Sequence, residues 1–377
     1  MKEKRILLIA SQAGSLIRFR GDFIKSLVDT GYMVFTAAPS YPDKIYNQIS
    51  DIGATPIEFN LQRTGLNPFK DFKSIKQLKS IITENKIDLV FPYTVKPVIY
   101  GSMAANMCKV PVISLITGLG YAFTGLTWKA RILQRLNETL YKFSIRKNKV
   151  IVFQNKDDYQ LFLDRKVISE NQDVDFVSGS GVNLNQFNFK EKTVTDKVRF
   201  LLVARLIKEK GIALYMEAAK ILKGKYPKTE FHLIGAPETS PSAINEIEIK
   251  DLHNKGVIIF HGVQLNIEEH LNRTDVFILP SYYREGLPRT TLEACACGNP
   301  IITTDSVGCR ESVKEGVNGF LIEPQNLEAL VKSMEYFITN PERIKEMGAN
   351  SRKYAEERFD VNIINQDLIN LIRRTLN

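Results

Sequence analysis

Short apolar runs alternate with longer, helix-like stretches along the whole chain. In the first half, runs of strand length lie at residues 5–10, 34–38, 88–92, 110–116, 149–154 and 173–179. A second series follows at residues 199–206, 230–235, 257–262, 275–280 and 300–305. Alternation of this kind is typical of βα units around a mostly parallel sheet. The pattern therefore predicts an α/β fold.

A polar stretch rich in Gly and Asn interrupts this alternation between residues 179 and 192. The chain has 377 residues, which is more than one hydrophobic core usually serves. We therefore predict two doubly wound domains, residues 1–188 and 189–377, with ligands at the carboxyl ends of the strands in the cleft between them. The pattern from about residue 340 onward is helical, and the last helix could pack back on the first domain.

Composition narrows the class of protein. The hydrophobic fraction of 44% and the charged fraction of 25% are those of an ordinary globular protein. The first apolar run, residues 6–10, is too short for a secretion signal, and no run approaches the roughly 18 apolar residues of a membrane span. The four cysteines follow the spacing of neither a disulfide framework nor a zinc site. We expect a cytoplasmic protein that binds no metal.

The net charge of +9 lies entirely in the first half of the chain. Residues 1–190 hold 26 Lys and Arg against 16 Asp and Glu, whereas the rest of the chain holds 25 against 26. Such asymmetry indicates an anionic partner for the first domain: phosphate groups, a lipid surface or nucleic acid. Because no nucleic-acid motif is present, we do not expect nucleic acid.

Residues 125–150 are the most basic segment, with seven basic side chains and one acidic one. Apolar residues recur there at helical spacing: Ile132, Leu136, Leu140 and Phe143. A basic amphipathic helix of this type can lie on an anionic membrane, through cations such as Lys129, Arg131 and Arg135. An ordinary helix that packs on the sheet fits the pattern equally well.

Two glutamates follow the strand at residues 275–280. Glu285 lies in the loop after the strand, and Glu293 lies in the helix that Pro288 opens as its predicted first residue. The free N–H groups at the start of that helix form an anion site between the two carboxylates. A nucleotide diphosphate could bind there while the carboxylates accept hydrogen bonds from sugar hydroxyls. The alternative is that both glutamates are solvated surface residues.

Two cations follow the first strand of the second domain. Arg205 comes directly off that strand, and Lys210 lies beside Gly211 at the start of the next helix. Cations at this position could hold a diphosphate and offset the charge on a departing nucleotide. A solvated turn explains the same residues as well.

These segments together resemble the family 4 retaining glycosyltransferases, which have the GT-B fold of two Rossmann-like domains with a cleft. Glu285 and Glu293 match the E-x7-E signature of that family, and ARLIKEKG matches its donor-phosphate segment. SGSGVNLNQF is similar to its interdomain segment, and SVGCRESVKEGVNGFLIEP to the region after its E-x7-E helix. The resemblance spans nearly the whole chain.

The resemblance implies roles for the donor-side residues. Arg205 and Lys210 would contact the diphosphate, Glu285 the sugar hydroxyls and Glu293 the ribose. The backbone of Gly286, Leu287 and Pro288 would meet the phosphates. The family also implies that the acceptor attacks on the face from which the nucleotide leaves, with no protein nucleophile and no metal.

The first domain resembles transferases that extend lipid-linked bacterial glycans. The resemblance lies in SQAGSLIRFRGDFIKSL, TVKPVIYGS and ITGLGYAFTG. It makes these residues candidates for the acceptor side: Gly14, Ser15, Lys96, Thr117, Gly118 and Gly120. Ordinary loop packing is the alternative. There is no GxGxxG after the first strand, which disfavours an NAD enzyme.

The histidines depart from the family pattern. Many relatives place one histidine in the first domain near the donor sugar, but all four here lie in the second. A backbone group near Thr117 or Gly118 could take its place. The turn from Gly262 to Gln264, which includes Val263, is a candidate for contacts with the nucleotide base.

The sequence therefore predicts a retaining transferase that moves a hexose or N-acetylhexosamine from a UDP-sugar to a polyprenyl-diphosphate-linked glycan. The UDP-sugar is a substrate, and no cofactor is expected. We expect a peripheral protein at the cytoplasmic face of the membrane, attached through its basic first domain. The alternatives are a sugar-nucleotide epimerase or hydrolase on the same fold, and a non-catalytic protein that binds nucleotide-sugars or lipid-linked glycans.

Overall fold

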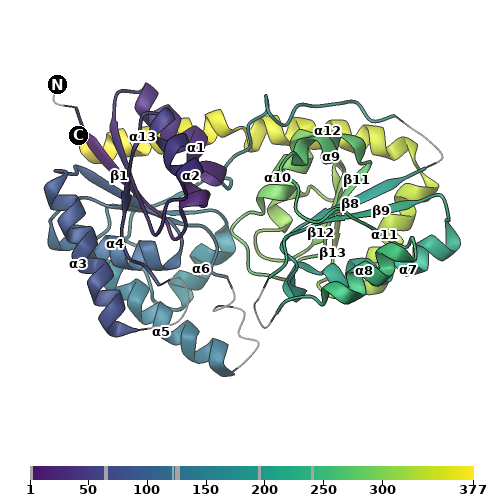
Figure 1. Cartoon of the computed structure of the whole chain (residues 1–377), viewed down its shortest axis with the longest axis horizontal. Coiled ribbons are helices and arrows are strands. Elements are labelled where there is room, and N and C mark those ends of the chain that lie inside the picture. The colour runs from purple at the N-terminus through teal and green to yellow at the C-terminus, as the bar shows by residue number, and fades with distance from the viewer. Residues whose placement is uncertain (1–2, 63–66, 121–122, 124–127, 194–196, 239–241) are drawn as a thin grey trace. The chain divides into compact units, whose positions relative to one another are not determined.

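The computed structural model describes residues 3–62, 67–120, 123, 128–193, 197–238 and 242–377. These residues form two compact units, Met1–Ser180 with Val361–Asn377 and Gly181–Asp360. Each unit is an α/β layer structure. In Figure 1 the first unit is purple to blue with its last helix in yellow, and the second unit runs from teal through green to yellow. None of the helices in the described residues is long and apolar enough to cross a membrane.

The first unit is built on parallel strands. Four of them pair in the order β3-β2-β1-β4, with the bounds β1 Arg5–Ile9, β2 Met33–Ala38, β3 Thr55–Glu58 and β4 Leu89–Pro92. Three more pair in the order β5-β6-β7, with the bounds Ile113–Ile116, Val150–Phe153 and Val174–Phe176. Single bridges, Val90 to Val112 and Tyr93 to Leu115, join the two groups. The sheet order changes direction between β1 and β4, which places a ligand crevice at their carboxyl ends.

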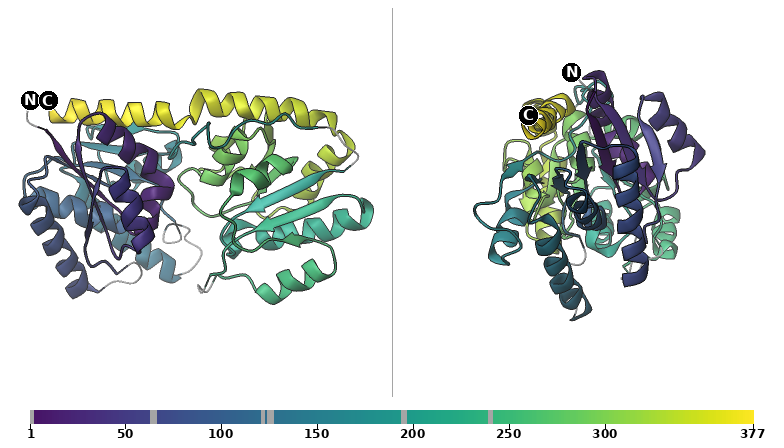
Figure 2. Two further views of the ribbon diagram at one scale, coloured as in Figure 1. Left: turned by 45° about the horizontal axis from the view of Figure 1, so that its top comes forward. Right: turned by 90° about the vertical axis from the view of Figure 1, so that its left-hand side faces the viewer.

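Helices cover both faces of this sheet. One face carries α1 Ala13–Asp29, α2 Asp43–Asp51 and α13 Val361–Leu376, and the other carries α3 Pro68–Glu84, α4 Val95–Met107, α5 Trp128–Ile145 and α6 Lys156–Asp164. The apolar face of α13, which includes Leu368 and Ile372, is buried in the same core as Leu16 and Phe23 of α1. Figures 1 and 2 show α13 beside α1. The last helix therefore completes the core of the first unit.

The second unit is a six-stranded parallel sheet in the order β10-β9-β8-β11-β12-β13. The bounds are β8 Arg199–Val203, β9 Glu230–Ile234, β10 Ile259–Phe260, β11 Val276–Leu279, β12 Ile301–Thr304 and β13 Gly319–Ile322. Its helices are α7 Ile212–Lys225, α8 Glu246–Asn254, α9 Ile267–Arg273, α10 Arg289–Ala296, α11 Leu327–Thr339 and α12 Glu342–Arg358. The order reverses between β8 and β11, so a doubly wound sheet of this kind binds ligands there.

The structure divides the chain at residues 180 and 181, whereas the sequence placed the boundary at 188 and 189. The reason is local packing, because Val182 and Phe187 are buried in the core of the second unit. The Val182 amide also donates to the carbonyl of Phe359, 2.7 Å away. The polar stretch after residue 179 therefore belongs mostly to the second unit. The sequence also missed two short strands, β3 and β13.

Candidate active site

The loops after β8 and β11 meet at the point where the second sheet reverses its order. The short helix η2, Lys208–Lys210, follows β8, and the loop that contains Glu285 follows β11. The carbonyl of Glu209 accepts hydrogen bonds from the amide N–H groups of Tyr282 and Tyr283 and from the Ser281 hydroxyl, at 2.9, 3.2 and 3.2 Å. Main-chain hydrogen bonds therefore fix the two loops against each other.

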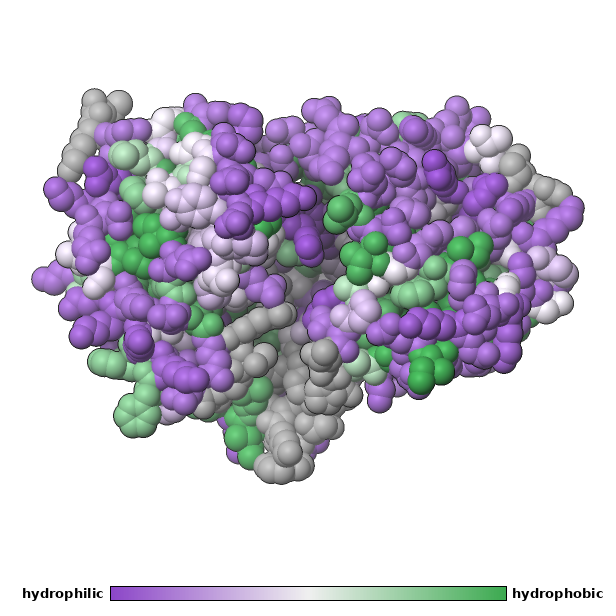
Figure 3. Space-filling model, in the orientation of Figure 1, coloured by the Kyte–Doolittle hydropathy of each residue, from purple (hydrophilic) through white to green (hydrophobic). Residues whose placement is uncertain are grey.

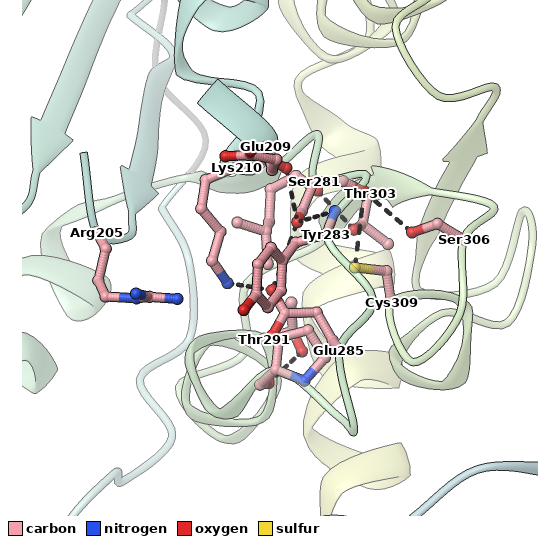
Figure 4. Close-up of polar contacts among 12 residues, drawn as sticks. Arg205, Glu209, Lys210, Ser281, Tyr283, Glu285, Thr291, Thr303, Ser306 and Cys309 are labelled. Carbon is pink, nitrogen blue, oxygen red and sulfur yellow. Dashed lines mark hydrogen bonds and ion pairs between the residues drawn. The ribbon is translucent and has the colours of Figure 1, made fainter. Parts of the chain in front are cut away.

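Lys210 and Glu285 form an ion pair across this junction, as Figure 4 shows. Their side chains are only 12% and 15% exposed. The Ser281 hydroxyl lies 3.5 Å from the same Glu285 oxygen. The structure thus brings together two residues that the sequence singled out separately, and Glu285 is not a solvated loop residue.

Gly211 allows this close junction. It has φ +73°, in the left-handed region that favours glycine, and links η2 to α7. A Cβ atom at this position would lie 2.1 Å from the carbonyl oxygen of Pro280, at the end of β11. Only glycine therefore lets the Lys210 backbone pass so near the Glu285 loop.

A second glycine supports the Glu285 loop from the side of β12. A Cβ atom on Gly308 would lie 2.4 Å from the Gly286 carbonyl oxygen and 2.6 Å from that of Glu285. The hydroxyl of Ser306 donates to the Ser281 carbonyl at 3.0 Å, and Thr304 donates to the same carbonyl oxygen. The loop is therefore held by the backbone on two sides.

Arg205 lies on the other side of the same junction. Its guanidinium pairs with Glu238 at 3.3 Å and lies 5.7 Å from the centre of the Tyr283 ring. The Lys210 ammonium is also 5.7 Å from that ring centre. Burial alone would lower the pKa of Arg205, but Tyr283 and Glu238 raise it above its ordinary value. Both cations therefore lie beside one aromatic ring.

Helix α10 starts at Arg289, so Pro288 is its N-cap and not its first residue as predicted. Glu293 is 9% exposed, which excludes a solvated surface position. Its carboxylate accepts a hydrogen bond from Arg289 Nε at 2.8 Å, one turn earlier in the helix. Arg289 and Glu293 therefore form an ion pair along the first turns of α10.

The turn after β10 holds the predicted base-contact residues. Val263 is exposed, and Gly262 has φ +65°. The Gln264 amide group donates to the carbonyl of His261 at 2.7 Å, which closes the turn.

Three histidines lie behind this turn. His232 Nδ1 and His261 Nε2 are 2.9 Å apart, and the His270 ring meets the His261 ring edge-on. Burial lowers the pKa of all three, and that of His261 falls to about 4. They are therefore neutral at pH 7. No group of three or more His, Cys, Asp or Glu side chains in the described part of the chain is arranged to hold a metal ion.

In the first unit, Gly14 and Ser15 lie in the first turn of α1, after β1. The Ser15 hydroxyl is 2.9 Å from the hydroxyl of Tyr93, which directly follows β4. A Cβ atom on Gly14 would meet nothing within 4 Å. These residues therefore occupy the crevice position of the first sheet, and Tyr93 is a member that sequence reasoning missed.

The other acceptor-side candidates form no hydrogen bond with Ser15 or Tyr93 in the described part of the chain. Lys96 donates to the Gln62 carbonyl at 2.7 Å and pairs with Asp71 of α3 at 3.3 Å, so its ammonium is held against α3. Thr117 and Gly118 follow the carboxyl end of β5, and Gly118 has φ +95°.

Two family models match the chain. The model "Glycosyl transferase 4-like" matches residues 5–155, and "Glycosyl transferases group 1" matches residues 185–354. Together they match most of the chain and leave the junction between the units unmatched.

Curated relatives match along most of the chain. It is 27% identical to an N,N'-diacetylbacillosaminyl-diphospho-undecaprenol alpha-1,3-N-acetylgalactosaminyltransferase of Campylobacter jejuni, over 99% of both chains. It is also 27% identical to the UDP-Gal:alpha-D-GlcNAc-diphosphoundecaprenol alpha-1,3-galactosyltransferase of Escherichia coli, over 78% of this chain and 76% of that protein.

Solved structures share the fold. A glycosyltransferase of Rickettsia africae superposes with a TM-score of 0.82 at 19% identity and covers 100% of both chains. Anabaena HepE, in complex with UDP and glucose, has a TM-score of 0.79 at 18% identity and covers 99% of this chain and 100% of that one. The chain therefore belongs to the glycosyltransferases of the GT-B fold, and its first part matches the glycosyl transferase 4-like family and its second part the glycosyl transferases group 1 family.

Proposed function

We propose that this glycosyltransferase is a retaining enzyme that moves a hexose or N-acetylhexosamine from a UDP-sugar to a polyprenyl-diphosphate-linked glycan. The observation that carries the donor half is the Lys210–Glu285 pair, which lies at the switch point of the second sheet beside the start of α10. Cation, carboxylate and helix start are the three groups that a sugar diphosphate needs there.

Each donor-side residue has a role in this proposal. The diphosphate binds at the start of α10 and to Arg205 and Lys210, because both cations lie 5.7 Å from the centre of the Tyr283 ring and so face the same place. Glu285 accepts hydrogen bonds from the sugar hydroxyls, and its pair with Lys210 places sugar and phosphate next to each other. Glu293, buried and oriented by Arg289, accepts hydrogen bonds from the ribose.

The reaction exchanges one glycosidic bond for another. The bond between the sugar C1 and the β-phosphate oxygen breaks, and the acceptor hydroxyl oxygen bonds to C1 from the same face. The hydroxyl proton passes to the departing phosphate oxygen. Arg205 and Lys210 stabilise the charge that develops on that phosphate, which is where preorganised cations lower the barrier most. No protein nucleophile takes part.

The acceptor half rests on the relatives and on charge. The Campylobacter jejuni and Escherichia coli enzymes are named for sugars linked to diphospho-undecaprenol, and the former matches 99% of this chain. The excess of basic residues in the first half suits a diphosphate-linked lipid substrate. We place this acceptor at the crevice of the first sheet, near Ser15 and Tyr93.

Attachment to the membrane surface is part of the same proposal. The side chains of Ile132, Leu136 and Phe143 on α5 are exposed, as are those of Phe69 and Phe72 near the start of α3. Figure 3 shows apolar side chains among polar ones over the lower ends of α3 and α5. Lysines and arginines flank both groups in the sequence, and this mixture favours the interface of an anionic bilayer.

A transfer assay tests the proposal. The purified protein is incubated with each of several UDP-sugars and a short polyprenyl-diphosphate monosaccharide, and the product's anomeric configuration is read by NMR. We expect one UDP-sugar to give an α-linked product and Glu285→Gln to lose at least about 100-fold in rate. The exposed Glu357→Gln on α12 serves as the control and keeps the wild-type rate. Free sugar or an epimerised nucleotide-sugar as the product would favour the alternative enzymes instead.

A further inference from the structure

The two cations of the donor site are each paired with a carboxylate of the same unit. Lys210 pairs with Glu285, and Arg205 Nη1 lies 3.3 Å from Glu238 Oε1. Figure 4 shows the Arg205 guanidinium pointing toward Tyr283 and the Lys210–Glu285 pair. The four side chains together carry no net charge. A diphosphate therefore gains a full ionic contact with one of these cations only if the carboxylate paired with that cation moves away.

The two pairs differ in how firmly they are held. Glu285 and Lys210 are 15% and 12% exposed, and Gly308 and Gly211 fix the loops that carry them. Glu238 and Arg205 are 27% and 44% exposed. Ion pairs with this degree of exposure to water contribute little to stability and exchange partners readily. Glu238 is therefore the carboxylate that can leave.

We propose that Glu238 is an internal counter-anion that the donor diphosphate replaces on Arg205. This inference rests on the proposed function. Glu238 follows β9, the strand beside β8, so its carboxylate reaches the guanidinium from the neighbouring strand. A phosphate oxygen that takes the position of Glu238 Oε1 gains the guanidinium hydrogen bond, and Glu238 must then move away from the like charge. Tyr283, 5.7 Å from the guanidinium carbon, keeps Arg205 in place during the exchange.

This exchange makes Glu238 a specificity-determining residue. A ligand with a diphosphate carries enough charge to displace the carboxylate, whereas a ligand without phosphate gains nothing from Arg205. Glu238 therefore lowers the affinity of the site for every anion. A diphosphate, which carries more charge than a single carboxylate, is the anion that still displaces Glu238. Substitution of Glu238 should change the binding of phosphate groups and not that of the nucleoside.

Calorimetric titration with UDP and with uridine tests this role. Glu238→Gln keeps the size of the side chain and its oxygen acceptor but removes the charge. We expect it to lower the Kd for UDP by about three- to tenfold at 50 mM salt and by less at 0.5 M salt. The Kd for uridine stays unchanged. Glu335→Gln removes the same charge from a 30% exposed glutamate that pairs with Lys225, and it leaves both affinities unchanged.

Three results separate the possibilities. If the wild-type protein binds no UDP, the proposed function fails before this inference is reached. If it binds UDP but Glu238→Gln binds UDP no more tightly, or tightens uridine equally, the exchange is overturned. In the Arg205→Ala background, Glu238→Gln should tighten UDP by clearly less, because the carboxylate then has no cation to hold and only its repulsion of the diphosphate is removed. An equal gain in that background would also overturn the inference.

Discussion

Gly211 gives the most direct test of the junction that positions Lys210. Replacement by alanine places a Cβ atom 2.1 Å from the Pro280 carbonyl oxygen, at a residue with φ +73°. Nonbonded carbon and oxygen do not approach so closely, so either η2 or the end of β11 must move. The nearest atoms belong to the backbone and a proline ring, which leaves no flexible side chain to yield.

The size of the effect follows from three contributions. Left-handed backbone costs alanine about 1–2 kcal/mol, and overpacking adds about 1–3 kcal/mol. About 0.4–1 kcal/mol is recovered because alanine restricts the unfolded chain. We expect Gly211→Ala to lower the free energy of unfolding by about 1–5 kcal/mol. A shift of about 1 Å at Lys210 should also lower kcat/KM by about 100-fold.

Urea unfolding followed by circular dichroism measures the first effect, and the transfer assay measures the second. Gly224→Ala is the matched control, because Gly224 lies within α7 and a Cβ atom there meets nothing within 4 Å. It should raise stability by about 0.5–1 kcal/mol and keep the wild-type rate. A Gly211→Ala protein with the wild-type urea midpoint and kcat/KM would refute the reasoning.

Three further predictions concern other parts of the molecule. Burial lowers the pKa of His261 to about 4, so the unfolded chain takes up a proton that the folded chain refuses. The stability that this half-buried neutral histidine contributes is present above pH 6.5 and falls by about 1–2 kcal/mol as the pH is lowered toward 4. In urea unfolding, the free energy of unfolding of His261→Gln should therefore change less between pH 7 and pH 4 than that of the wild type. Arg289→Ala leaves Glu293 without its 2.8 Å donor and should weaken uridine binding in calorimetry by about tenfold, with Arg289→Lys intermediate. Phe69→Ser with Phe72→Ser should reduce sedimentation with anionic vesicles and leave UDP affinity unchanged; equal sedimentation would remove α3 from the membrane surface.

The sequence predicted most strands because their apolar runs are continuous. Strand β11, for example, is four buried apolar residues, Val276–Leu279. The missed strand β3 lacks that signal, since it is the partly exposed edge strand TPIE. The other missed strand, the edge strand β13, has the sequence GFLI, an apolar run of only three residues after a glycine. The helical pattern of residues 361–376 was readable, but its apolar face does not say which core it joins. That choice depends on the shape of the α1 surface, which only the folded chain provides.

The donor-side residues were predictable as far as topology places them. Arg205, Lys210 and Glu285 all follow the carboxyl ends of neighbouring strands, and this brings them to one edge of the sheet. Their partners were not predictable. Nothing in the sequence distinguishes Glu238 and Tyr283 from other polar and aromatic residues in loops. The ion pair between Lys96 and Asp71 depends on how α3 packs on α4.

The donor-site residues differ in whether backbone or side-chain contacts hold them, and this difference separates residues that position the loops from residues that only bind the donor. The loops that carry Lys210 and Glu285 are joined through main-chain carbonyls, those of Glu209 and Ser281, and through the close approaches at Gly211 and Gly308. Changes at the glycines therefore move the whole loop and act on folding and catalysis together. By contrast, Glu238 meets Arg205 only through the outer atoms of their side chains, so its substitution should alter diphosphate affinity while the urea midpoint stays unchanged. This separation is why Glu238→Gln can report on binding alone, and a large loss of stability in that variant would show that the ion pair holds the loops as well.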